Sequence, residues 1–541
     1  MLSCTRRELI ASFLGAPLLA ACRGLDHARG FAGGFAGPDH GLGHKLREGF
    51  APEPSHVREV PIVVLGAGIA GLSAAWRLMR AGVSDFELLE LEREPGGTSR
   101  AGRNAISAFP WGAHYLPSPL PHARAARALL VDLGVAAQRG DGELEYDEEH
   151  WVRAPEERLF IADRWYEGLY PFAGASERDV AELARFEAHV AQLARLRDAA
   201  GKRVFAVPLA AAGDPGELAE LDRLSFAAWL DREGYRSARL RFYLEYGTRD
   251  DLCARLDQTS AFAGLHYQAA RSDERGPSQF LTWPDGNGQL VARLAARCGP
   301  RLRTGVLATR LIPLDGGRWE VRSFEPASGR AEALRAQHVI AALPDGVLSR
   351  ILPAELSRPS LASQGMQTGA WLVANVSLKS RPRSRGYPEC WDNVLYDSRS
   401  LGYVVATHQS DSRDRKRSVW TWYLPLTGEP AAERKRLYAL SFEECCALLL
   451  ADLSRPHLDI AEHIERIDVF RWAHAMPRPA PGMFFGPLAQ ARARAQQALP
   501  GLSFAHSELS GLALFEEAQW HGVRAAEEVL AARSVHTEPL T

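Results

Sequence analysis

The feature that most constrains the fold is a glycine-rich turn that follows an apolar run. Residues 63–65 (Val-Val-Leu) lead into Gly66, Gly68 and Gly71, which have the spacing Gly-x-Gly-x-x-Gly. This pattern is typical of a buried strand that turns tightly into a helix. The first glycine lets the chain turn, the second leaves room for a pyrophosphate, and the third lets the helix pack closely on the strand. The pattern therefore predicts a dinucleotide site.

The residues that follow complete a strand–helix–strand unit. The helix is expected to begin at Ile69 and Ala70, where free N–H groups and the positive end of the helix dipole attract phosphates. A second apolar run, residues 86–91, carries Glu90. An acid about 20 residues after the last glycine is expected to accept hydrogen bonds from a ribose. The unit predicts an α/β fold with a Rossmann-like domain built on a parallel sheet.

Length and charge narrow the function classes. A chain of 541 residues has room for two or three domains. Its formal net charge is -2 and it has no long basic run, so nucleic acid is not expected as a partner. No apolar run reaches the length of a membrane span. The cysteines have no metal-ligand spacing, so no metal site is expected, although one disulfide is possible.

The N-terminus reads as an export signal and a tether. Arg6 and Arg7 precede a short apolar region within residues 1–22 and resemble a twin-arginine signal. The segment that ends at Cys22 resembles a lipobox, which implies a lipid anchor on that cysteine. The alternatives are an ordinary secretory signal and a chance cysteine. Residues 23–57 have the composition of a glycine-rich linker. We expect an exported periplasmic or cell-envelope lipoprotein, folded with its dinucleotide before export and held at the membrane by this anchor.

A glycine pair after Glu90 carries a family resemblance. Gly96 and Gly97, together with Glu90 and the first glycine motif, resemble the start of the FAD-binding flavin amine oxidase and phytoene desaturase superfamily. The resemblance implies FAD as the cofactor, with the glycine pair close to it and Arg100 nearby. It also implies that residues 111–115 reach the flavin ring.

The C-terminal part of the chain extends the resemblance. Ala308 lies on a strand that resembles the one whose backbone meets the adenine. Glu508 matches the acidic position that contacts the cofactor, and Phe515 and Glu516 open a segment that resembles the final helix, whose first turn faces the flavin. Gly522 is expected to allow this helix to pack closely.

The resemblance also implies a domain order. The cofactor domain is expected in three parts, and an inserted α+β substrate domain in two. The cofactor domain takes residues 58–120, 281–345 and 466–535, and the substrate domain takes a mostly helical part at 121–280 and strands and helices at 346–465.

Two positions depart from the amine oxidase pattern. The strand lysine that holds a water beneath flavin N5 in many of these enzymes falls at Val373, and the aromatic residue before the last helix falls at Leu514. No cysteine follows Cys446, which excludes a C-terminal thioether to the flavin, so FAD is expected to be held non-covalently. Amine oxidation therefore competes with the desaturation or dehydrogenation of a lipophilic substrate.

The expected chemistry is hydride transfer from a C–H bond of a small-molecule substrate to flavin N5. Oxygen or another electron acceptor then reoxidises the flavin. His474 is the main catalytic candidate, as an acid or base, with Trp472 and His114 as further candidates; a structural role for His474 is the alternative. Aromatic residues between 370 and 425 either line a substrate cavity or fill a sheet core. Two other functions stay open: a non-catalytic flavin-binding assembly protein, and an FAD-dependent desaturase or isomerase.

Overall fold

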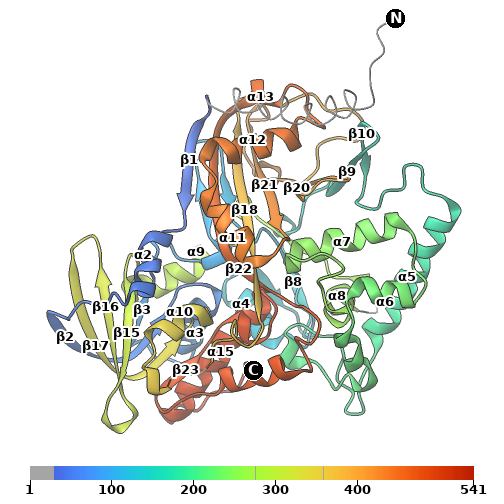
Figure 1. The fold of residues 1–541 in the computed structure, drawn as a ribbon. Helices are drawn as coiled ribbons and strands as arrows, with labels where there is room; N and C mark the ends of the chain where they lie inside the picture. Colours follow the sequence, from blue (N-terminus) through green and yellow to red (C-terminus); the bar gives the residue numbers. More distant parts are fainter. Residues whose placement is uncertain (1–29, 274–275, 357–358) are drawn as a thin grey trace, which may run out of the picture.

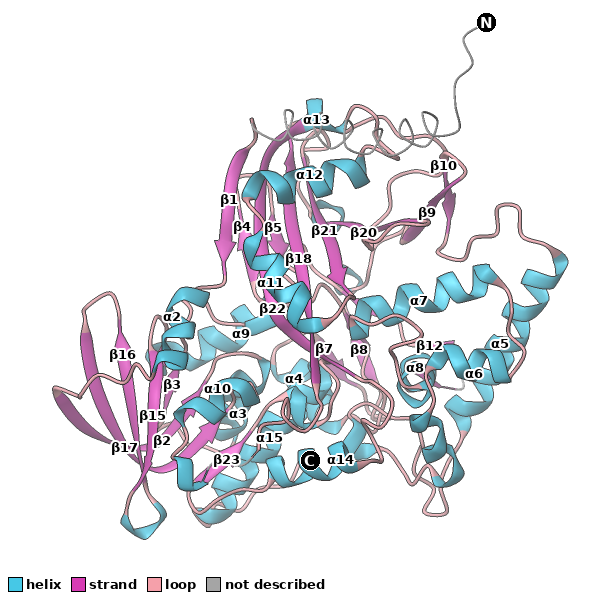
Figure 2. Ribbon diagram, viewed as in Figure 1, coloured by secondary structure: helices cyan, strands magenta, loops and turns pink. Residues whose placement is uncertain are grey.

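The computed structural model describes residues 30–273, 276–356 and 359–541 (Figure 1). The expected signal over residues 1–22, with Arg6, Arg7 and Cys22, lies outside the described residues. Two sheets dominate the described part of the chain, and a group of helices lies beside them (Figures 1 and 2). Within these described ranges, no helix is both long and apolar enough to cross a bilayer.

The first sheet is built around β2 (His56–Leu65), whose apolar end, residues 62–65, is buried on both faces. Its neighbours β3 and β17 run parallel to it, and β23 runs parallel to β17. The order is β14 (Leu302–Arg303), β3 (Glu87–Leu89), β2, β17 (Arg330–Ala341), β16 (Trp319–Glu325) and β15 (Leu307–Pro313), with β23 (Leu502–Phe504) on β17. Strands β15 and β16 are antiparallel to their neighbours, so the sheet is mixed rather than wholly parallel. Its parallel part, assembled from three separate stretches of chain, confirms the predicted Rossmann-like domain.

Helices pack on this sheet through one apolar core. The core joins Leu72 and Leu78 of the first helix to Val523 and Leu530 of the last. The helices are α3 (Ile69–Arg80), α4 (Arg124–Asp132), α9 (Gly288–Cys298) and α15 (Phe515–Ala532). The first and last helices of the domain thus lie against each other.

The second sheet has eight strands, and its faces serve different purposes. Its order is β1 (Ala32–Gly37), β22 (Ile464–Arg478), β18 (Gln367–Leu378), β21 (Ser418–Leu426), β20 (Gly402–Val405), β19 (Asp392–Leu395), β9 (Glu157–Ile161) and β10 (Arg164–Glu167). Along β18, Leu372 and Ala374 contribute to one core, whereas Trp371 and Val373 contribute to another, as alternation along a strand requires. The first core lies under α11 (Pro430–Ala439), α12 (Phe442–Leu453) and α13 (Ile460–His463). The other face of the sheet, which carries Trp371 and Val373, is available to form a functional site.

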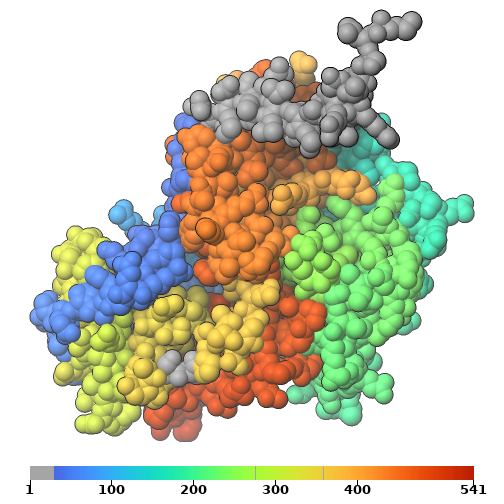
Figure 3. Space-filling view, viewed as in Figure 1, coloured from blue at the N-terminus to red at the C-terminus, as the bar shows by residue number. Residues whose placement is uncertain are grey.

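The inserted helices form a lobe beside this sheet (Figures 1 and 3). They are α5 (Glu177–Arg195), α6 (Phe226–Arg232), α7 (Ala238–Leu252) and α8 (Ala261–Ala269). Each is preceded by an N-cap serine whose side chain accepts a hydrogen bond from a first-turn N–H: Ser176, Ser225, Ser237 and Ser260. Helical and strand parts together give the predicted α+β insertion.

Short elements complete the chain. The paired strands are β4 (Ala101–Arg103) with β5 (Ala108–Pro110), β6 (Leu116–Pro117) with β13 (Phe280–Leu281), β7 (Ala136–Gln138) with β8 (Leu144–Tyr146), and β11 (Ser272–Asp273) with β12 (Gly276–Pro277). The remaining helices are α2 (His40–His44), α10 (Asp345–Ile351) and α14 (Pro487–Gln496).

The structure differs from the linker predicted over residues 23–57. Ala32 of β1 lies opposite Arg466 of β22, and Leu42 and Leu46 are buried. A Cβ at Gly33 would lie 1.7 Å from the Ile467 carbonyl oxygen, so glycine here permits close strand approach rather than flexibility.

The predicted start of the last part of the cofactor domain, residue 466, also differs from the structure. All of β22 belongs to the second sheet, because it pairs with β18 from Ile464 to Arg478. The C-terminal part of the cofactor domain therefore begins after Arg478 and not at residue 466.

Candidate functional site

A long cavity of about 350 Å³ starts at the C-terminal ends of β2 and β3. It runs between the first sheet, the glycine pair and the last helix. The predicted cofactor residues on its wall are Gly66, Gly68, Ile69, Ala70, Glu90, Gly96, Gly97, Ala308, Glu508 and Phe515. The structure thus brings together residues from three distant stretches of the chain.

The glycines leave the space that a pyrophosphate needs. The nearest atom to a Cβ built on Gly68 is the Gly97 Cα at 3.9 Å, so the methyl group would project into the cavity. Gly66 turns the chain with φ +90, and a Cβ on Gly71 would lie 1.8 Å from the Gly66 oxygen. Gly71 is absent from the cavity wall, and its role is the tight packing of turn and helix. The cradle fits a dinucleotide.

Glu90, which the sequence predicts to bind a ribose, lies on the cavity wall just after β3. Its Oε2 accepts a hydrogen bond from the Ala67 N–H (2.7 Å) and its Oε1 accepts one from the Glu92 N–H (2.9 Å). Burial raises the pKa of this carboxyl group, while the two N–H groups act in the opposite direction. Arg100 is not on the cavity wall. Its guanidinium pairs with Glu92 at 3.2 Å and lies 5.6 Å from the centre of the Phe470 ring, so it supports the loop instead.

The far wall is formed by the C-terminal segment. Glu508 is buried, and its Oε2 accepts a hydrogen bond from the Asp345 N–H (2.8 Å). Ala308 lies on the wall beside Val306. The N-terminal end of α15 faces the cavity at Phe515, so its unpaired N–H groups and positive dipole end can stabilise negative charge on a bound group.

A second pocket of about 120 Å³ continues from the cavity. The two spaces share wall residues, including Thr98, Ala113, Trp472, Leu514 and Phe515. The second pocket therefore lies where the redox ring of the cofactor would end and a substrate would begin.

Aromatic side chains line much of this pocket. Tyr115, Trp371, Tyr423 and Trp472 stand on its wall with His114. The His114 and Tyr423 rings lie 5.0 Å apart, and Tyr423 donates its hydroxyl hydrogen to the Gly112 oxygen (2.9 Å). The Trp472 indole N–H donates to the Trp111 oxygen (2.6 Å). These hydrogen bonds fix rings whose faces can attract a cation.

Three carboxyl groups and one guanidinium form the polar wall. The Tyr115 hydroxyl lies 3.4 Å from Asp250 Oδ2 and 3.3 Å from Asp251 Oδ1. Arg271 donates to Asp251 (3.2 Å) and to Glu516 (3.4 Å). Fully ionised, this group would carry a net charge of about -2.

Burial sets the acidity of the aspartates. It raises the pKa of Asp250 well above its usual range, and the nearby Asp251 and Asp392 raise it further. Burial also raises the pKa of Asp251, against the stabilising charge of Arg271. A cation bound beside these two carboxyl groups would favour their ionised forms.

The predicted catalytic residues divide between the two spaces. Trp472 and His114 line the second pocket, and desolvation lowers the pKa of His114 to about 4. His474 lines only the cofactor cavity, where its Nδ1 lies 3.3 Å from the Thr368 hydroxyl. Desolvation, and then the charges of Arg434 and Arg47, lower its pKa to about 4. The structure therefore separates His474 from the acidic pocket.

The two positions of departure from the family pattern both face the second pocket. Val373 and Leu514 are on its wall, and Lys379 lies beyond the end of β18. No lysine is on the wall that the described residues form. Glu516, expected to bind the cofactor, lies here and not in the cofactor cavity.

The sequence reading missed Asp250, Asp251 and Arg271. The aspartates end α7, and Arg271 follows α8, both in the inserted part of the chain. Two acids in the last turn of a helix oppose its dipole, which is the one local signal that marked them as unusual.

The aromatic residues of the second sheet serve both predicted purposes. Trp371 and Tyr423 line the pocket. Tyr403 instead stacks on Trp420 in the opposite core, with ring centres 4.1 Å apart.

Comparisons with known proteins assign the chain to a family. The model of a family described as flavin-containing amine oxidoreductases matches residues 69–530, and the chain belongs to this family. The protein is thus an FAD-dependent oxidoreductase, which confirms the predicted cofactor and enzyme class. Among curated protein sequences, none matches significantly.

Solved structures share its fold at low identity. Putrescine oxidase bound to putrescine is similar with a TM-score of 0.63 and 18% identity, over 88% of this chain and 100% of that one. Cyclohexylamine oxidase from Brevibacterium oxydans gives 0.62 and 17%, with the same coverage. A fatty acid isomerase from P. acnes gives 0.60 and 16%, over 87% of this chain and 98% of that one.

Proposed function

We propose that this FAD-dependent oxidoreductase oxidises an amine that binds as a cation in the second pocket. The observation that carries the proposal is a set of three carboxyl groups, the buried Glu516 and the half-buried Asp250 and Asp251, opposed by one guanidinium, Arg271. Buried charge without a partner is costly, so the excess carboxylate favours a cationic guest. A lipophilic acid or polyene would leave this set uncompensated.

Bound FAD would supply the redox step, accepting a hydride from the carbon next to the amine nitrogen before an electron acceptor such as oxygen reoxidises it. The protein's own part is to position the amine. Trp371, Tyr423 and Trp472 would hold the substrate by its apolar body and its charge, and would exclude water from the reacting carbon.

The aspartates would also move the proton. An ammonium group has no lone pair to help release a hydride, so it must lose a proton first. Asp250, with its raised pKa, is suited to take that proton, and the hydroxyl of Tyr115 lies between it and Asp251. The lone pair left on the nitrogen then forms the C=N bond as the hydride leaves the carbon, so the product would be an iminium ion.

Asparagine substitutions test this role. With a reactive amine, Asp251→Asn and Asp250→Asn should each raise KM by about 30-fold, because a hydrogen bond to a charged group contributes about 2 kcal/mol. Asp257→Asn is the matched control, since Asp257 is exposed and, among the described residues, forms an ion pair with Arg255 alone. Unchanged KM in both pocket variants would contradict cation binding.

We further propose that the enzyme is exported and held at a membrane. Support comes from the sequence alone, from Arg6, Arg7 and Cys22. Cys22→Ala should move the protein from the membrane fraction to the soluble fraction of expressing cells. Export that persists after Arg6 and Arg7 are both changed to lysine would contradict the twin-arginine route.

A further inference from the structure

One end of the second sheet gathers four strand ends. Leu378, the last residue of β18, pairs with Ile464 at the start of β22 and with Ser418 at the start of β21. Ala32, at the start of β1, pairs with Arg466. The described chain therefore begins at the same end of the sheet where β18 stops.

Two loops at this end concentrate positive charge. Residues 379–389 follow β18 and residues 411–417 precede β21. Together they carry eight basic and three acidic side chains, a net charge of +5 in a chain whose formal net charge is -2. The basic residues are Lys379, Arg381, Arg383, Arg385, Arg413, Arg415, Lys416 and Arg417. We call these two loops the basic end.

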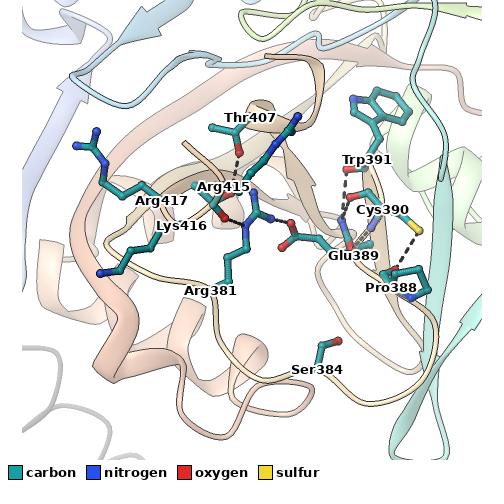
Figure 4. A network of polar contacts seen from close by, with 12 residues as sticks. Arg381, Ser384, Pro388, Glu389, Cys390, Trp391, Thr407, Arg415, Lys416 and Arg417 are labelled. Atoms are coloured by element: carbon teal, nitrogen blue, oxygen red, sulfur yellow. Dashed lines mark hydrogen bonds and ion pairs between the residues drawn. The ribbon is translucent and has the colours of Figure 1, made fainter. Parts of the chain in front are cut away.

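The loops touch, and their acids already have partners. Arg381 donates to the Arg415 oxygen (2.9 Å) and also pairs with Glu389 (Figure 4). Asp414 pairs with Arg417 at 2.6 Å. The third acid, Asp411, pairs with Arg153 at 2.6 Å.

Six of the basic side chains are left for another partner. They are exposed, and none makes an ion pair with any residue that the structure describes: Lys379, Arg383, Arg385, Arg413, Arg415 and Lys416. Like charges on two loops that touch repel one another, so an anionic partner would relieve the repulsion.

An exposed leucine adjoins the basic end. Leu458 is 92% exposed, the highest value among the large exposed hydrophobic side chains of the described chain. Its neighbour His457 donates from Nδ1 to the Arg383 oxygen (3.0 Å), so Leu458 lies beside the loop 379–389. Basic side chains around a protruding apolar one suit the boundary between lipid headgroups and acyl chains.

We propose that the basic end docks on a membrane surface rich in anionic phospholipid, with Leu458 inserted between headgroups. The position of the chain's start agrees with this orientation. The ten residues from Cys22 to Ala32 can span at most about 35 Å, so a lipid on Cys22 would keep this end near the bilayer. Anchoring by lipid chains is strengthened by a polybasic patch.

An acidic protein is the competing partner. The positive charge of the basic end would suit an acidic protein equally well. An isolated exposed leucine, however, gains nothing from a purely ionic interface, whereas a bilayer can bury it anywhere on its surface. The membrane is therefore the occupant that both observations favour, and this inference does not depend on the identity of the substrate.

Vesicle binding tests the inference. The test uses the full-length, FAD-loaded protein with the substitution Cys22→Ser, which removes any lipid anchor. This protein should co-sediment with vesicles of phosphatidylcholine and phosphatidylglycerol but not with vesicles of phosphatidylcholine alone. Changing Arg383, Arg385, Arg415 and Lys416 to glutamate should weaken binding at least about 100-fold. Leu458→Ser should weaken it by about tenfold even at high salt, where ionic attraction is screened.

A matched variant controls for total charge. Changing Arg195, Lys202, Arg310 and Arg350 to glutamate alters the net charge equally at exposed positions away from the basic end, and should leave vesicle binding within about twofold. Equal losses in the two quadruple variants would overturn the inference. Binding to an acidic protein column with no binding to anionic vesicles would also overturn it.

Discussion

Gly522→Ala tests the close contact between the first and last helices of the cofactor domain. Gly522 lies on α15, where a Cβ would meet the Ala70 carbonyl oxygen of α3 at 2.0 Å. Ordinary contact begins at 3.4 Å, so the helices must separate by about 1.4 Å along this line. Ala70 is in the first turn of α3, next to the phosphate cradle. The substitution should therefore disturb both stability and FAD binding.

The expected loss in the free energy of unfolding follows from the packing at this contact. Overpacking costs about 1–3 kcal/mol, and backbone atoms cannot move aside as a side chain would, so the upper value, about 3 kcal/mol, is expected. An unfolding entropy of about 2.1 cal/mol/K per residue gives about 1 kcal/mol/K for a chain of this length. The expected fall in Tm is about 3 °C, together with a lower FAD content.

Calorimetry and the flavin absorbance of the purified protein measure both effects. Gly346→Ala is the control, since Gly346 is a helical, exposed glycine and a Cβ there meets nothing within 4 Å. It should leave the Tm unchanged or slightly raised. A Gly522→Ala protein with the Tm and FAD content of the parent would refute the packing argument.

Two further predictions concern buried carboxyl groups. Glu90→Gln should raise the Kd of the apoprotein for FAD at least about tenfold, because a charged acceptor for the ribose is lost; flavin fluorescence titration measures this, and an unchanged Kd would contradict the ribose role. Burial raises the pKa of Glu517 from 4.5 to about 7, so the folded state holds a proton that the unfolded state has released between these values. Stability should fall as pH rises from about 4.5 to 7, by about 3 kcal/mol at most. Glu517→Gln keeps the shape and should remove this slope, whereas parallel curves of Tm against pH for the two proteins would contradict it.

The sequence predicts the fold best where local chemistry decides it. Gly66, Gly68 and Gly71 are needed by the turn itself, so the strand–helix–strand unit can be read directly. The strand β1 could not be predicted, because its glycines resemble a flexible linker until the partner strand is known. Pairing across more than 400 residues of sequence decided that element.

The candidate site shows the same division. Gly66, Gly68, Gly96 and Gly97 lie in glycine turns, and Ile69 and Ala70 lie at a helix start, so these cofactor residues carry a local signal. Asp250, Asp251 and Arg271 look like surface charges, and the packing of α7 against α8 and β22 brings them to one pocket wall. The sequence predicted His474 near the cofactor, and it lies on the cofactor cavity wall, but the sequence does not say how far along β22 the acidic pocket lies.

The central claim is that a cationic amine reacts in the acidic pocket. Anaerobic mixing of the FAD-loaded enzyme with a panel of primary amines, alcohols of the same shape and fatty acids tests it most directly. The account predicts that amines alone bleach the oxidised flavin, and that Asp251→Asn slows this bleaching at low amine concentration. Bleaching by a fatty acid or an alcohol, with none by any amine, would contradict it.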